Sequence, residues 1–80
     1  MSAKPPRETV GVVERFSAEE GWGALAAADL PDGCFVHYST IQMDGYHVLA
    51  PGQRVRFTYE EPGFLQDGYP YRALLVWPLE

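Results

Sequence analysis

Alternating apolar and polar residues recur along the chain in short segments, which is the pattern of strands that bury one face. The clearest segment, QRVRFTYE, places Val55, Phe57 and Tyr59 on one face and two arginines with a threonine on the other. We expect this segment to form a half-buried strand. Its arginines, Arg54 and Arg56, are interpreted as a solvated face rather than as phosphate clamps.

Four further segments have the composition of strands. TVGVVERF is rich in β-branched residues, and its Gly11 predicts a bend or a bulge. WGALA contains alanines that favour a helix, but its two glycines and its strand-like neighbours favour a strand. CFVHY and YRALLVW complete the set. The expected strands therefore span residues 9–16, 22–26, 34–38, 53–60 and 71–77.

The segments between these strands carry turn residues. ADLPDG is expected to be a loop that closes on its Asp-Gly pair, and STIQ a single helical turn. Longer loops are expected in MDGYHVLAPG and EPGFLQDGYP. Residues 1–7 hold two prolines and no periodic pattern, so we expect a tail there and one folded domain over residues 8–80. Five short strands joined by turns predict an all-β, five-stranded antiparallel barrel.

Composition narrows the function classes. A chain of 80 residues, 46% of them hydrophobic, is long enough for one compact domain. Six basic against eleven acidic residues give a net charge of −5, which argues against nonspecific binding of phosphates. The lone Cys34 predicts no internal disulfide, and no Cys or His pair has the spacing of a zinc site, so we expect a reducing, cytoplasmic setting and no metal. No apolar run approaches the roughly 20 residues of a membrane helix.

Period-two geometry sorts the residues of the third expected strand onto two faces. Cys34 and Val36 share one face, and Phe35 and His37 share the other. A histidine is costly to bury without partners, whereas cysteine and valine are common in protein interiors. We therefore expect Cys34 and Val36 to point inward, and Trp22 on the neighbouring strand to point outward with Phe35 and His37.

Exposed aromatic rings that gather on one face of a small barrel are typical of a binding surface. Flat rings suit flat ligands, and unpaired bases stack on aromatic side chains with about 1–3 kcal/mol per base. Two other interpretations stay open from the residues alone. Trp22 and Phe35 could be core residues if the faces are inverted, and His37 could be a structural histidine with satisfied hydrogen bonds.

Three motifs in the same order resemble the bacterial cold-shock protein family. GVVERFSAEEGWGAL is similar to the opening of that family, including its K-G-F-G-F-I motif. CFVHYSTI resembles V-F-V-H-F followed by S-A-I, and DGYHVLAPGQRVRFTYEE resembles D-G-[FY]-x-x-L-x-x-G-Q-x-V-x-F. The resemblance runs from Gly11 to about Val76. It implies an OB-fold barrel that binds single-stranded RNA or DNA.

The resemblance also implies which side chains contact the nucleic acid. Base-stacking roles carry over to Phe16, Trp22, Phe35, His37, Tyr38 and Tyr46, of which Phe16 could be half core and the two tyrosines could instead close loops over the barrel end. Glu14 and Arg15 stand where the family usually has lysine and tryptophan, and the guanidinium of Arg15 can itself lie on a base. Glu20 replaces a family lysine, and Ala24 replaces a phenylalanine.

These features together predict a single-stranded nucleic-acid-binding protein, with the RNA-chaperone or cold-shock regulatory role that the resemblance implies. We expect no catalysis and no cofactor, because no nucleophile, acid–base pair or metal cluster has a recognisable spacing. The alternative is a protein-interaction module of the same fold, either a weak homodimer or a binder of a protein partner. It would use Trp22, Phe35, Phe64, Leu65 and Trp77.

Overall fold

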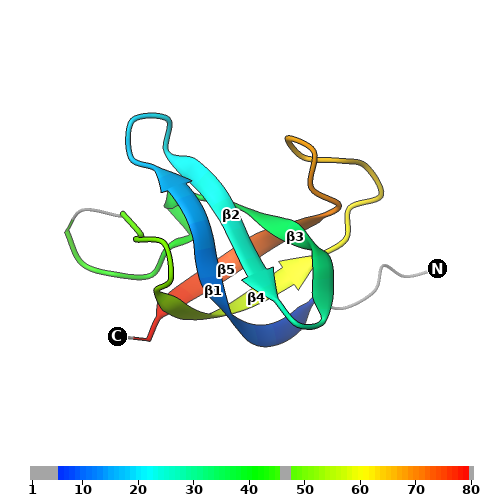
Figure 1. Ribbon diagram of the computed structural model, residues 1–80, viewed down its shortest axis with the longest axis horizontal. Helices are drawn as coiled ribbons and strands as arrows, with labels where there is room; N and C mark the ends of the chain where they lie inside the picture. Colours follow the sequence, from blue (N-terminus) through cyan, green and yellow to red (C-terminus); the bar gives the residue numbers. More distant parts are fainter. Residues whose placement is uncertain (1–5, 46–47, 80) are drawn as a thin grey trace.

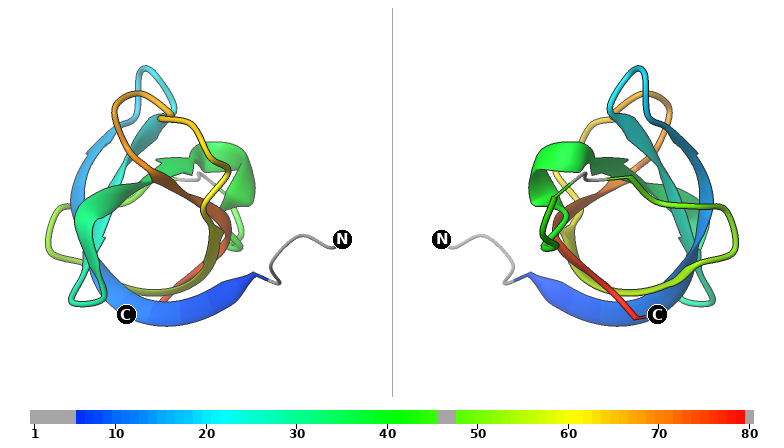
Figure 2. Two further views of the ribbon diagram at one scale, coloured as in Figure 1. Left: turned by 90° about the vertical axis from the view of Figure 1, so that its right-hand side faces the viewer. Right: turned by 90° about the vertical axis from the view of Figure 1, so that its left-hand side faces the viewer.

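The computed structural model describes residues 6–45 and 48–79, which form five strands and one short 3-10 helix. The elements are β1 (Arg7–Ser17), β2 (Trp22–Ala27), β3 (Leu30–His37), η1 (Tyr38–Thr40), β4 (Arg54–Glu60) and β5 (Tyr71–Pro78). The strands, labelled in Figure 1, close into a barrel in the order β1-β2-β3-β5-β4, and the end-on views of Figure 2 show the closed ring. All five expected strands are present, and the predicted all-β OB-fold barrel is confirmed.

Strand pairing differs from the expectation at one seam. β3 and β5 pair in parallel, with Cys34 opposite Tyr71 and Phe35 opposite Arg72, whereas the other four pairs are antiparallel. A purely antiparallel barrel is therefore a wrong prediction for this chain. The reason is one of parity: a closed ring of five strands cannot alternate in direction all the way round, so at least one neighbouring pair must run the same way.

The long first strand curls around the barrel and pairs with two partners. Its first half pairs with β4 and its second half with β2. A Cβ at Gly11 would lie 2.1 Å from the carbonyl oxygen of Ala26, so glycine permits this close approach. The register shift itself falls between Val13 and Arg15 rather than at Gly11. β1 begins at Arg7, one residue before the expected start of the folded domain.

The turn between β2 and β3 is shorter than ADLPDG suggested. Only residues 28 and 29 form the turn, and β3 already begins at Leu30. Leu30 is buried in the core, and this burial stabilises β3 from Leu30 onward, although the residues that follow it favour a turn. Asp29 accepts a hydrogen bond from Thr9 Oγ1 at 3.0 Å, which ties the turn to β1.

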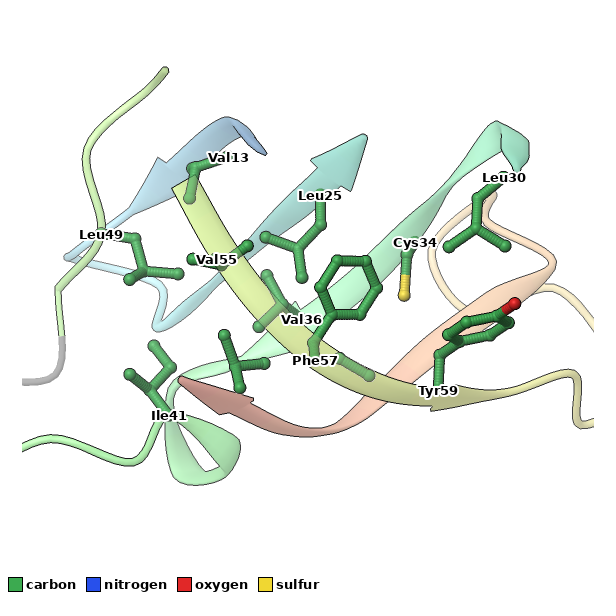
Figure 3. Close-up of a cluster of buried hydrophobic side chains, with 12 residues drawn as sticks. Val13, Leu25, Leu30, Cys34, Val36, Ile41, Leu49, Val55, Phe57 and Tyr59 are labelled. Atoms are coloured by element: carbon green, nitrogen blue, oxygen red, sulfur yellow. The ribbon is translucent and has the colours of Figure 1, made fainter. Parts of the chain in front are cut away.

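The barrel interior is filled by side chains from every strand, as the close-up in Figure 3 shows. Phe57 on β4 is the largest fully buried side chain, and Val55 and Tyr59 are buried on the same face of that strand, as predicted. Burial raises the pKa of the Cys34 thiol to about 12, so this cysteine behaves as a small hydrophobe. The buried cluster comprises Val13, Leu25, Leu30, Cys34, Val36, Ile41, Leu49, Val55, Phe57, Tyr59, Ala73 and Val76.

Candidate nucleic-acid interface

The outer sides of β2 and β3 carry three of the predicted site residues. Trp22 pairs with His37 across the two strands, and Phe35 lies two residues before His37 on β3. All three side chains are partly exposed, whereas Cys34 and Val36 between them are fully buried. The predicted orientation of these strands is therefore confirmed, and the inverted arrangement is wrong. We call the outer side of β2, β3 and the adjoining end of β1 the aromatic face.

The rings on and beside the aromatic face form two contacting pairs. The ring centroids of Trp22 and Phe35 are 5.5 Å apart, with an angle of 28° between their planes. The centroids of His37 and Tyr38 are 4.7 Å apart, and Tyr38 is one of the most exposed aromatic side chains described. β2 and β3 run side by side in Figure 1, and Trp22 lies directly opposite His37 across them. Such a surface is suited to flat, unsaturated ligands.

Local hydrogen bonds hold the imidazole of His37. It caps the N-terminus of η1, where its Nδ1 accepts from the backbone N–H of Ser39 at 3.3 Å and lies 2.8 Å from Ser39 Oγ. Thr40 Oγ1 donates to the carbonyl oxygen of His37 at 2.7 Å. The close serine and histidine are thus a helix cap between near neighbours in the chain. The cap fixes the orientation of the ring before any ligand arrives.

Arg15 reaches across the aromatic face to a residue that sequence reasoning did not select. The bulge in β1 lets Arg15 lie opposite Ala24, and its Nη2 donates to the Oη of Tyr69 at 2.7 Å. The guanidinium carbon lies 5.7 Å from the ring centroid of Trp22 and 5.9 Å from that of Tyr69. Tyr69 belongs to a loop that lies more than 50 residues away in the chain, so no local pattern could have indicated this contact.

Phe16 is divided between core and surface, as the sequence suggested. Its ring packs against the buried cluster, and it also borders a hollow of about 180 Å³ beside Trp22. Glu20 is exposed on the rim of the same hollow, and Glu14 is exposed on β1 next to Arg15. The hollow is lined by Arg15, Phe16, Ser17, Glu20, Trp22 and Gly23. A ligand that entered it would meet aromatic surface and a carboxylate together.

The arginines that border the aromatic face already have partners. Arg72, which lies opposite Phe35 on β5, forms an ion pair with Glu60 in which Nε and Oε2 are 2.6 Å apart. Arg15 donates a hydrogen bond to the hydroxyl of Tyr69, which occupies one of its donors but does not offset its charge. The face therefore presents few uncompensated positive charges, which disfavours strong contacts with phosphates.

The residues of the alternative, protein-binding interpretation are spread over several elements. Trp22 and Phe35 belong to the aromatic face, and Trp77 lies on β5 opposite Arg56 of β4. Phe64 and Leu65, 56% and 66% exposed, project from the loop between β4 and β5. The guanidinium carbon of Arg72, the residue opposite Phe35 on β5, lies 5.9 Å from the ring centroid of Phe64, whereas Trp77 is stacked under Arg56. Tyr46, the remaining predicted site residue, lies outside the described residues.

Residues 6–45 and 48–79 contain neither a cluster of metal ligands nor a membrane-spanning helix. Within these ranges, no three His, Cys, Asp or Glu side chains lie close enough together to hold a metal ion. Within the same ranges, no helix has the length and apolar character needed to cross a bilayer.

Comparison with known proteins identifies the family. The model of the 'Cold-shock' DNA-binding domain matches residues 9–68. The chain is 39% identical over 70 residues to cold shock-like protein CspD of Vibrio cholerae, covering 88% of this chain and 86% of that one. It is 42% identical over 50 residues to cold shock-like protein CspB of Escherichia coli K12, covering 62% and 70%. The chain belongs to the cold-shock domain family.

Proposed function

We propose that this protein binds single-stranded RNA or DNA by stacking unpaired bases on the aromatic face, and that it acts without catalysis as an RNA chaperone or cold-shock-type regulator. One observation carries the proposal: Trp22, Phe35 and His37 emerge together on neighbouring strands directly above a packed core. Membership of the cold-shock domain family supports it.

The spacing of the rings favours a single strand over a duplex. Residues two apart on a strand are separated by about 7 Å, so consecutive bases must spread apart to occupy Phe35 and His37. Bases in a duplex are stacked and paired, and they cannot make this arrangement without being opened. A protein that holds spread bases keeps the strand open, which is the physical requirement for a chaperone of RNA.

Electrostatics limit the affinity. Glu20 lies beside Phe16 and Trp22, Glu14 is exposed next to Arg15 in the chain, and Arg72 is already paired with Glu60. Exposed charges contribute less than about 1 kcal/mol each, so the carboxylates weaken binding without outweighing several stacking contacts of about 1–3 kcal/mol. We therefore expect modest affinity that depends on stacking more than on phosphate contacts. Modest affinity also allows the strand to be released.

A salt series tests this proposal. The chain has two tryptophans, so Trp77→Phe leaves Trp22 as the only tryptophan and makes its emission report on the aromatic face. We expect oligothymidine or a short unstructured RNA to quench this emission. The logarithm of the affinity should fall with the logarithm of the salt concentration with a slope of about −1 or shallower, which corresponds to one or two phosphate contacts on a single strand.

A blunt-ended duplex of the same length is the control, and it should bind at least about tenfold more weakly, because its bases are already stacked and paired. A steep slope that requires many phosphate contacts would contradict the stacking mechanism. If neither oligothymidine nor the unstructured RNA quenches the Trp22 emission, the proposal is wrong.

The exposed pair Phe64 and Leu65 favours a second candidate, a protein-interaction module. An apolar loop tip of this kind is a plausible anchor for a second chain. In that case oligonucleotides would leave the Trp22 emission unchanged, and sedimentation would show concentration-dependent self-association that Leu65→Ala weakens.

A further inference from the structure

The aromatic face continues beyond Phe35 to a position that has no side chain. Positions 33, 35 and 37 alternate with the buried Cys34 and Val36, so all three lie on the outer side of β3. Position 33 is a glycine with φ of +85°. A Cβ at Gly33 would lie 3.0 Å from both Cδ1 and Cε1 of Tyr69. The Tyr69 ring thus occupies the place that a side chain at position 33 would take.

The fold places Tyr69 there by strand register. β5 runs parallel to β3 with Tyr71 opposite Cys34, so Tyr69, two residues earlier, comes alongside the start of β3. A tight turn holds it: the backbone N–H of Gln66 donates to the carbonyl oxygen of Tyr69 at 2.8 Å, and that of Tyr69 donates back at 2.9 Å. The two residues inside this turn both have positive φ. The ring is therefore presented by a short, doubly closed loop.

Arg15 holds the other end of the Tyr69 ring. Its Nη2 donates to the phenolic oxygen at 2.7 Å from a position on β1 that lies opposite position 24 of β2. That position is Ala24, which is fully buried although it alternates onto the outer side with Trp22. Arg15 is therefore paired across the two strands with a small side chain. The alanine and the arginine, two departures from the family pattern, are thus parts of one arrangement.

We propose that Tyr69 is a further base-binding position, which takes an unpaired nucleobase next to the base on Phe35. The inference rests on the proposed function and deepens it. The row His37, Phe35 and Tyr69 follows β3 at steps of about 7 Å, the same spacing that spreads the other bases. Arg15 acts as a positioning residue that keeps the ring on Gly33. The loop between β4 and β5 in this way replaces the rings missing at positions 15 and 24.

Oligothymidines of two lengths test the proposal in the Trp77→Phe background. A tetramer can be seated on Trp22, Phe35 and His37 alone, whereas a heptamer has bases to spare for Tyr69. We expect Tyr69→Leu, which keeps apolar cover over Gly33 but removes the ring, to weaken heptamer binding about tenfold, the loss of one stacked base. Tetramer binding should change less than about twofold.

Two variants serve as matched controls. Tyr69→Phe keeps the ring and loses only the solvent-exposed hydrogen bond from the Arg15 guanidinium, so it should bind both lengths within about threefold of the parent. Leu65→Ala, in the same loop and 66% exposed, should change neither affinity. If Tyr69→Leu binds the heptamer as tightly as the parent does, the proposed subsite is wrong. It is also wrong if Tyr69→Leu loses the same affinity for the heptamer and for the tetramer. Absence of binding by the parent to either oligonucleotide would instead remove the proposed function, and the subsite with it.

Discussion

The barrel has two outer surfaces that expose apolar side chains, and only one of them has the features of a base-binding site. The aromatic face lies on β2, β3 and the end of β1. The second surface lies on the start of β1, on β4 and on β5, and we call it the β4–β5 face. Its exposed or partly exposed apolar residues are Val10, Val12, Leu75 and Trp77.

The two faces differ in what covers their rings. On the β4–β5 face, the guanidinium carbon of Arg56 lies 4.3 Å from the ring centroid of Trp77, and Arg56 forms an ion pair with Glu8 at 2.9 Å. That ring is thus already stacked under a cation of the same chain. On the aromatic face, Trp22 has a neighbouring ring at 5.5 Å and the Arg15 guanidinium carbon at 5.7 Å, farther than Arg56 lies from Trp77. We therefore expect the cover over the rings, rather than the exposed apolar area, to distinguish the proposed binding face from the β4–β5 face.

The largest expected effect comes from a substitution that disrupts the aromatic face and leaves the β4–β5 face in place. A Cβ at Gly23 would lie 2.2 Å from the carbonyl oxygen of Arg15 and 2.7 Å from Cα of Phe16, so Gly23→Ala must push β1 away from β2. We expect it to lower the free energy of unfolding by about 3 kcal/mol, at the upper end of overpacking effects. Urea denaturation followed by tryptophan emission measures this loss.

Gly52→Ala is the control for this experiment. Gly52 has φ of +87° but open space around its Cβ position, so the substitution costs only the backbone strain of about 1 kcal/mol. Equal losses in the two variants would show that close approach of β1 and β2 at Gly23 is unimportant for stability.

The next effect compares the two tryptophans directly. Trp22→Ala removes a ring from the aromatic face and should weaken binding of a single strand by about 2 kcal/mol, or about thirtyfold. Trp77→Ala removes the ring under Arg56 and should change the affinity less than about twofold, because that ring has no part in stacking bases. The anisotropy of an end-labelled oligothymidine measures both affinities. Tryptophan emission is unsuitable for this comparison, because each variant lacks a different tryptophan. Similar losses for both would mean that the strand uses the β4–β5 face as well.

Sequence reasoning located the strands and sorted their faces, because these depend on local alternation. Cys34 and Val36 could be placed inside because the chemistry of His37 leaves only one consistent choice for β3. The loop between β2 and β3 was predicted too long, because burial of Leu30 outweighs the turn preference of the residues that follow it.

Contacts between segments that are far apart in the chain could not be predicted from the sequence. The Arg15–Tyr69 hydrogen bond joins residues 54 positions apart, and it depends on the parallel register of β3 and β5. The cover of Trp77 by Arg56 likewise depends on the register between β4 and β5. Alternation assigned Arg56 to a solvated face, which is where it lies, but it could not say that a ring would lie beneath it.

The smallest expected effect concerns charge and uses one substitution on each face. Glu20→Lys changes the net charge by two units beside Trp22, and it should tighten binding a fewfold and steepen the salt slope by less than one unit, because one new phosphate contact on a single strand adds about 0.7. Glu8→Lys makes the same change in net charge on the β4–β5 face and also breaks the ion pair with Arg56. It should leave the slope unchanged and cost less than about 1 kcal/mol of stability. Because both variants shift the overall charge equally, a difference between their slopes can come only from where the strand lies. Equal slopes would mean that the strand responds to net charge and not to the aromatic face.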